Sequence, residues 1–133
     1  MKRMLLTMFT MAALVGCDSH GEPTGSVCPP TQTLTYENFG KAFMDTYCVD
    51  CHDSAKTGNA RHGAPSFHDY DTVLGVRQTI EHIDEQAAAG PDAVNTAMPE
   101  DDPKPTEAER RQLGEWLACG APSAPVTTAR AAR

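Results

Sequence analysis

The sequence predicts a small all-α domain. Apolar residues recur at helical spacing in three segments, within residues 36–47, 73–87 and 106–118, and no segment shows a convincing strand pattern or an internal repeat. The chain has 133 residues, of which 117 remain without the 16-residue export segment that the N-terminus predicts. That length suits one domain with a modest core and is too short for two ordinary ones.

The N-terminus has the pattern of a bacterial export signal. Lys2 and Arg3 form a basic start, and residues 5–15 form an apolar run shorter than the roughly 20 residues needed to span a bilayer. We therefore expect residues 1–16 to be a signal peptide. The end of the run, Leu14-Val15-Gly16-Cys17, resembles a lipobox, which predicts lipidation of Cys17. The alternative is an ordinary thiol near a secretory cleavage site.

Lipidation would anchor an exported protein to a membrane of the bacterial cell envelope, facing the periplasm. Each buried acyl methylene contributes about 0.8 kcal/mol, so several chains on one residue anchor stably. Residues 17–33 are rich in Gly, Pro, Ser and Thr and lack apolar periodicity, which predicts a flexible tether. The domain is then expected over residues 34–120, and residues 121–133 are expected to form a disordered tail.

The first predicted helix begins after Thr35, a good N-cap residue, and runs into Cys48. Glu37 lies in its first turn, where a negative charge is favourable. Gly40 costs about 1 kcal/mol relative to Ala in a helix interior, so its place on the apolar face predicts close approach by another backbone. The apolar positions are Tyr36, Phe39, Phe43 and Tyr47.

Two further helices are predicted. The middle one, over residues 73–87, follows Asp69 or Asp71 and ends before Gly90. The last one begins with the capping box Thr106-Glu107-Ala108-Glu109 and ends with Gly120 at the C′ position. Their apolar stripes consist of Val73, Val76, Ile80, Ile83 and Ala87 in the middle helix and Leu113, Trp116 and Leu117 in the last.

Residues 48–52 read Cys-Val-Asp-Cys-His, the spacing at which two thiols form thioethers to a haem and the next imidazole ligates its iron. Cys48 and Cys51 are therefore the predicted attachment sites and His52 the predicted axial ligand. The alternatives are a redox-active thiol pair, half of a zinc site, or chance. A redox pair favours a βαβ context and zinc a second ligand pair at short spacing, and the sequence suggests neither.

The iron needs a second axial ligand, and Met98 is the best-placed candidate. It lies in a Pro-rich loop before the last helix, where Pro99 favours an extended backbone. The alternative is a buried loop methionine, which is the role expected for Met44 in the core. His68 is the strongest rival ligand, although we expect it and the other histidines to be solvated.

The Nδ1 proton of His52 needs an acceptor that also fixes the orientation of the ring. The carbonyl of Pro65, shortly after the motif, is the predicted acceptor. The alternative role for Pro65 is that of a plain loop proline.

Cys28 and Cys119 are the two cysteines left without a role, and we expect them to form a disulfide. The expected compartment is oxidising. The bridge would join the segment before the first helix to the end of the last one. In the entropic model so long a loop is worth about 4 kcal/mol.

The charge of the mature chain favours protein partners. Without Lys2 and Arg3 it would carry nine basic and 18 acidic side chains, a formal charge of -9. This balance disfavours nucleic acid as a partner. It favours redox proteins that dock through a basic patch.

Together these features resemble the class I c-type cytochromes over about residues 36–120. The resemblance rests on the first helix with the motif at residues 48–52, the Ala64-Pro65 segment, Met98-Pro99 and the aromatic Trp116. It implies a cytochrome c-like fold of three to four short helices that wrap one covalently bound haem c. It also implies that the first and last helices cross near Gly40 and that His52 and Met98 ligate the iron.

The function that the resemblance implies is single-electron transfer between redox partners outside the cytoplasm, by a membrane-tethered protein with one haem and no enzymatic activity. One alternative is a haem enzyme or a sensor of peroxide or gas, in which Met98 leaves the iron. Another is a cytochrome subunit of a larger redox complex.

Overall fold

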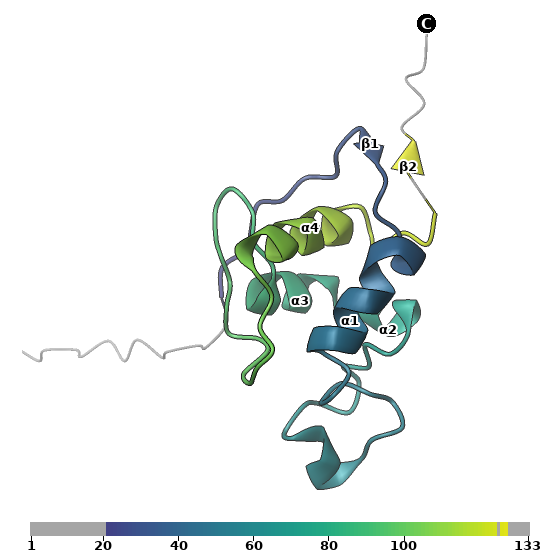
Figure 1. Cartoon of the computed structure of the whole chain (residues 1–133), viewed down its shortest axis with the longest axis vertical. Coiled ribbons are helices and arrows are strands. Elements are labelled where there is room, and N and C mark those ends of the chain that lie inside the picture. The colour runs from purple at the N-terminus through teal and green to yellow at the C-terminus, as the bar shows by residue number, and fades with distance from the viewer. Residues whose placement is uncertain (1–20, 125, 128–133) are drawn as a thin grey trace, which may run out of the picture.

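The protein is a mostly helical domain, seen in a computed structural model that describes residues 21–124 and 126–127. The elements in chain order are β1 (Thr31–Gln32), the π-helical turn η1 (Tyr36–Gly40), α1 (Lys41–Tyr47), the 3-10 turn η2 (Gly58–Arg61), α2 (Val73–Gln78), α3 (Ile80–Ala87), α4 (Glu107–Ala118) and β2 (Val126–Thr127). In Figure 1, α4 lies over α3, η1 and α1 stand beside them, and the loop with η2 projects beyond the end of α1. This architecture agrees with the predicted small all-α fold.

Some predictions fall outside this range. The signal peptide over residues 1–16, Cys17 and the last residues of the tail lie outside the described residues. Within the described part, none of the helices is long and apolar enough to cross a membrane.

The first helix begins where the sequence predicts. The Thr35 hydroxyl accepts a hydrogen bond from the Asn38 amide at 3.1 Å, and the Asn38 side chain accepts one from the Thr35 amide at 2.7 Å. This reciprocal pair is a capping box that satisfies two backbone donors at the helix start. η1 and α1 then follow without interruption as far as Cys48, which is the C-cap of α1.

The middle helix is broken in two, which the periodicity does not predict. α2 is capped by Thr72 rather than by Asp69 or Asp71, since the Thr72 hydroxyl accepts from the Gly75 amide at 3.1 Å. The break lies at Thr79, whose hydroxyl donates to the carbonyl of Gly75 at 3.2 Å. Such a side chain competes with the backbone ladder, which explains why α3 starts afresh at Ile80.

α4 crosses the first helix at a glycine. Trp116 is fully buried, and a Cβ atom at Gly40 would overlap its ring, so the two helices approach as closely as they do only because residue 40 has no side chain. The capping box of Thr106 and Glu109 is present, and Gly120 follows the C-cap with φ of 78°. The predicted ends of the last helix and its crossing at Gly40 are confirmed.

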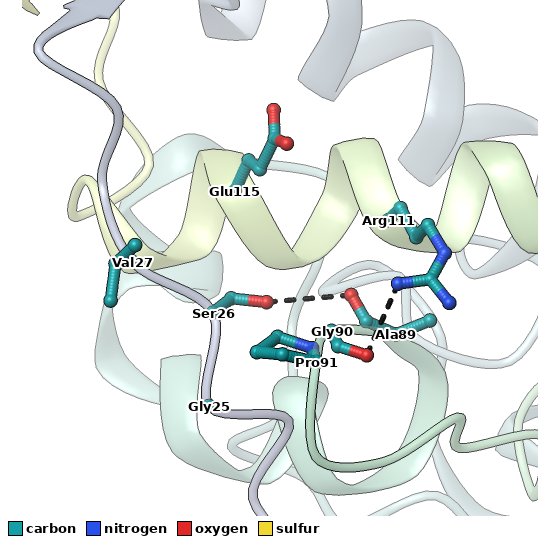
Figure 2. Close-up of a pocket in the computed structure, with 8 residues that line it drawn as sticks. All are labelled: Gly25, Ser26, Val27, Ala89, Gly90, Pro91, Arg111 and Glu115. Carbon is teal, nitrogen blue, oxygen red and sulfur yellow. Dashed lines mark hydrogen bonds between the residues drawn. The ribbon is translucent and has the colours of Figure 1, made fainter.

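Residues 21–33 are attached to the domain by hydrogen bonds and by the disulfide of Cys28, so the prediction of a flexible tether as far as residue 33 is wrong for this segment. Thr24 is fully buried, and its amide and hydroxyl donate to the Asp84 carboxylate at 2.8 and 2.6 Å. Figure 2 shows the segment crossing α4, where Ser26 donates to the carbonyl of Ala89 at 3.4 Å beside a cavity of about 160 Å³. Small polar residues that suggest a linker here form specific hydrogen bonds instead.

The start of the predicted tail is also ordered. Ala121 is fully buried, and the carbonyl of Pro122 accepts hydrogen bonds from the Tyr36 amide at 2.8 Å and the Trp116 indole at 3.2 Å. β2 then pairs antiparallel with β1 over two residues. The domain therefore extends beyond the predicted limits of 34 and 120 at both ends.

A disulfide joins Cys28 to Cys119, as the sequence predicts, with the two Cα atoms 4.7 Å apart. It links the packed N-terminal segment to the end of α4. The two cysteines are 91 positions apart in the sequence, so the loop that the bridge closes contains most of the domain.

Candidate functional site

The candidate haem-attachment motif forms one turn directly after α1. The Cys48 amide donates to the Met44 carbonyl at 2.9 Å at the end of α1. The amides of Cys51 and His52 then donate to the Cys48 carbonyl at 3.2 and 3.0 Å. Both sulfurs and the imidazole therefore project from a single tight turn. Neither Cys48 nor Cys51 is in a disulfide.

The thiols lack the environment of a redox-active pair. Burial raises the pKa of Cys48 to about 12, and burial followed by the charge of Asp50 raises the pKa of Cys51. Reactive thiols have lowered pKa values and sit at helix N-termini, whereas Cys48 caps the C-terminus of α1. These environments therefore disfavour thiol redox chemistry. The two sulfurs, which form no disulfide, remain candidates for covalent attachment of a cofactor.

His52 has its ring orientation fixed by the backbone. Its Nδ1 lies 3.0 Å from the carbonyl oxygen of His68, and its ring stacks on Tyr70 with centroids 4.4 Å apart. A carbonyl only accepts, so Nδ1 carries the proton and Nε2 keeps a lone pair. Burial lowers the pKa of His52, which favours the neutral ring. His52 is thus prepared to ligate a metal through Nε2.

The predicted role of Pro65 is wrong, because the acceptor for His52 is the carbonyl three residues later. The Pro65 carbonyl is occupied by Arg61, whose Nη2 donates to it at 2.6 Å, and by the His68 amide at 3.1 Å. Arg61 also donates to the His68 carbonyl at 2.9 Å, so this oxygen serves both Arg61 and His52.

Arg61 is a site residue that the sequence analysis missed. It is 4% exposed, and it organises the loop after the motif by bonding the Asp53 carbonyl at 2.8 Å and the Asp69 carboxylate at 2.9 Å. The available signal was a single arginine between the motif and Pro65, with an aspartate eight residues later. That signal does not distinguish a buried arginine from a solvated one.

Met98 lies half-buried against the same core cluster that Cys48 contacts. Its amide donates to the Gln86 carbonyl at 2.9 Å, and its own carbonyl accepts from Arg110 at 2.8 Å. The backbone of the predicted distal ligand is therefore held on both sides. Met44 is fully buried, in agreement with the core role expected for it.

His68 differs from its prediction as a solvated histidine. It is 6% exposed and lies against His82, with ring centroids 4.5 Å apart, while the neighbouring Phe67 is 66% exposed. The Nδ1 of His68 has no hydrogen-bond partner within the described residues.

The side chains of the motif, together with Met98, form a donor set that could hold a haem iron. Within residues 21–124 and 126–127, no group of three or more His, Cys, Asp or Glu side chains gathers around one point. Because a porphyrin supplies four nitrogen ligands to its iron, the protein needs to supply at most two axial ligands. His52, through Nε2, and Met98, through its sulfur, are the two residues that would supply them, and the free thiols of Cys48 and Cys51 would form the covalent bonds to the porphyrin.

Comparison of the chain with protein-family models, with curated proteins and with solved structures finds no match.

Proposed function

We propose that this protein is a mono-haem c-type electron carrier, with haem bound covalently at Cys48 and Cys51 and ligated by His52 and Met98. The observation that carries the proposal is the Nδ1 hydrogen bond of His52 to the His68 carbonyl, 3.0 Å long, beside two thiols without a disulfide. It prepares an axial ligand at the one position where the attachment spacing requires it.

His52 and Met98 are the two residues that would hold the haem iron, the first through Nε2 and the second through its sulfur. When bound, the haem supplies a one-electron couple at its iron. The ring of His52 is oriented by the His68 carbonyl, and the backbone of Met98 is held by hydrogen bonds at its amide and its carbonyl. A thioether favours the ferrous state more than a second imidazole does, which predicts a higher potential than that of a bis-histidine haem.

The surroundings of Met98 support a carrier more than an enzyme. Among the described residues near it, Arg110 is buried and bonded to carbonyls, and residues 100–102 are exposed acids beyond Pro99. Acid–base catalysis needs a titratable group within hydrogen-bond reach of the reacting atom. A guanidinium does not supply one, because it stays protonated and cannot exchange a proton with a reacting atom.

The proposal includes the cellular setting that the sequence predicts. The carrier is exported and tethered to a membrane by lipid on Cys17, facing the periplasm of a bacterial envelope. The acidic mature chain, with 18 acidic and nine basic side chains, meets redox partners through a basic patch on their side.

The test is an electrochemical titration of protein exported from a host that matures c-type cytochromes. A carrier gives a reversible one-electron couple, low-spin spectra in both states, and little response of the reduced protein to carbon monoxide. Rapid carbon monoxide binding by the wild type would instead favour the enzyme or sensor alternative. A colourless product would contradict the whole proposal, and the double variant Cys48→Ala/Cys51→Ala is its matched negative control.

A further inference from the structure

Arg110 is a buried cation that is bonded to backbone carbonyls. It projects from the first turn of α4 and is 3% exposed. No ion pair to Arg110 occurs among the described residues, in contrast to Arg61, which pairs with Asp69 at 2.9 Å. An arginine stays protonated even when buried, so a full positive charge lies inside the domain.

This charge is held by backbone carbonyls that all belong to the segment leading to Met98. Nη1 donates to Ala87 at 2.7 Å, Asn95 at 3.0 Å and Met98 at 2.8 Å. The backbone carbonyl of Arg110 in turn accepts from the Ala89 amide at 2.9 Å. Arg110 thus forms hydrogen bonds to both ends of the segment that runs from the end of α3 to Met98.

Retaining a charge in this place is costly. Removing a cation from water costs several kcal/mol unless strong hydrogen bonds compensate, and carbonyl dipoles compensate less than a carboxylate would. A neutral side chain could fill similar volume without that cost.

We propose that Arg110 is a positioning residue for the distal ligand, which holds the Met98 backbone toward the haem and whose buried charge favours the ferrous iron. The proposal rests on the proposed function, because it concerns the same haem site. Its structural basis is the three carbonyl bonds of Arg110 and the lack of an ion pair to it within the described part of the chain. An uncompensated positive charge in a low-dielectric interior stabilises the state of the iron with one more electron.

The test compares three holoprotein variants. Arg110→Gln removes the charge, Arg110→Lys keeps the charge but loses the planar fork, and Arg111→Gln is the control on the neighbouring residue. Arg111 is 48% exposed at its side chain and pairs with Glu107 at 2.7 Å, so its charge is solvated. The readouts are the midpoint potential, the spectroscopic signature of thioether ligation, and carbon monoxide binding to the reduced protein.

We expect Arg110→Gln to lower the midpoint potential below that of Arg111→Gln. We also expect carbon monoxide binding to rise about tenfold or more, the effect of losing one charge-assisted hydrogen bond. Arg110→Lys should restore most of the potential but not the slow carbon monoxide binding, which separates the charge from the positioning.

Unchanged potential and unchanged carbon monoxide binding in both Arg110 variants would overturn the proposal while leaving the haem assignment intact. Absence of haem from the wild type would instead contradict the proposed function. If neither Arg110 variant folds, hydrogen exchange of the wild-type holoprotein decides. Slowly exchanging Arg110 guanidinium protons support the contacts with Met98, and rapidly exchanging ones overturn them.

Discussion

The hydrogen bond between His52 and the His68 carbonyl does two things at once. It fixes the tautomer, so that Nε2 is the open nitrogen, and it fixes the plane of the ring against Tyr70. Arg61 donates to the same oxygen at 2.9 Å. The carbonyl is therefore shared between two donors and accepts the hydrogen bond from His52 Nδ1 more weakly. A weaker acceptor makes His52 a less basic ligand, an effect with the same sign on the potential as the thioether.

At this scale the account predicts the effect of Met98→Ala. Removal of the thioether opens one axial position, so the reduced variant should bind carbon monoxide readily and its midpoint potential should fall. Redox titration and carbon monoxide difference spectra measure both effects. Met44→Leu is the control, because this volume-conserving change in the core should cost less than about 1.5 kcal/mol and leave the iron low-spin. A Met98→Ala protein that retains the wild-type spectrum and potential would refute the ligand assignment.

Sequence spacing predicts the relative placement of residues that lie close together in the chain. Cys48, Cys51 and His52 lie within five positions, so their mutual placement needs only one turn of backbone. The acceptor for His52 depended on how the loop of residues 53–70 folds, and there the buried Arg61 occupies the Pro65 carbonyl. Nothing local in the sequence shows that an arginine will be buried among carbonyls, so the same reasoning missed both Arg61 and Arg110.

At the scale of elements, the ends of helices were predictable because capping is a local interaction. The boxes at Thr35 and Thr106 are formed by residues three positions apart. The break at Thr79 was not predictable from periodicity, since the apolar stripe continues through it and only the hydroxyl bond to Gly75 interrupts the ladder.

The capping box of α4 gives a pH dependence of stability. Hydrogen bonds from Thr106, first at its side chain and then at its amide, lower the pKa of Glu109 from 4.5, so the folded state favours the carboxylate. This contribution is complete above the ordinary pKa of a glutamate and is lost as the pH falls through the lowered value. Glu109→Gln should therefore lose less stability on acidification than the wild type, measured by urea unfolding of the holoprotein. Equal losses in Glu109→Gln, the wild type and the exposed control Glu115→Gln would contradict this assignment.

The crossing of the first helix over α4 predicts the effect of Gly40→Ala. The added methyl group would overlap the Trp116 ring, which is fully buried and cannot move freely. Overpacking of this kind costs about 1–3 kcal/mol, despite the higher helix propensity of alanine. Thermal unfolding should therefore show a lower midpoint for Gly40→Ala, and no such loss for Ala42→Ser at an exposed position of α1. A stabilised Gly40→Ala would show that the crossing is looser than described.

At the scale of the whole molecule, both ends of the described part of the chain belong to the domain. The N-terminal segment is fastened to α3 through Thr24 and Asp84, and the C-terminal one to the first helix through Pro122. Composition suggested linkers at both places, because Gly, Pro, Ser and Thr also dominate flexible segments. Pairings between residues 60 positions apart, such as Thr24 with Asp84, leave no periodic trace in a sequence.

The disulfide joins the N-terminal segment to the end of α4, so its removal should lower the free energy of unfolding of the whole domain. The double variant Cys28→Ser/Cys119→Ser opens a loop closed by cysteines 91 positions apart. The higher entropy of the unfolded chain without this cross-link should lower the free energy of unfolding by about 4 kcal/mol. Urea unfolding of the holoprotein should show a loss of this order, with the spectrum of the haem unchanged in the folded state. Val27→Ala, at a position 76% exposed, serves as the control. A double variant as stable as the wild type would show that the packed segments hold without the bridge.

The most direct test of the central claim is the intact mass of the exported protein under denaturing conditions. The account predicts the mass of the polypeptide plus one haem, which persists after extraction with acidified organic solvent because both thioether bonds are covalent. The same measurement on Cys48→Ala/Cys51→Ala should give the bare chain. A wild-type chain of bare polypeptide mass, or haem lost on extraction, would contradict the account.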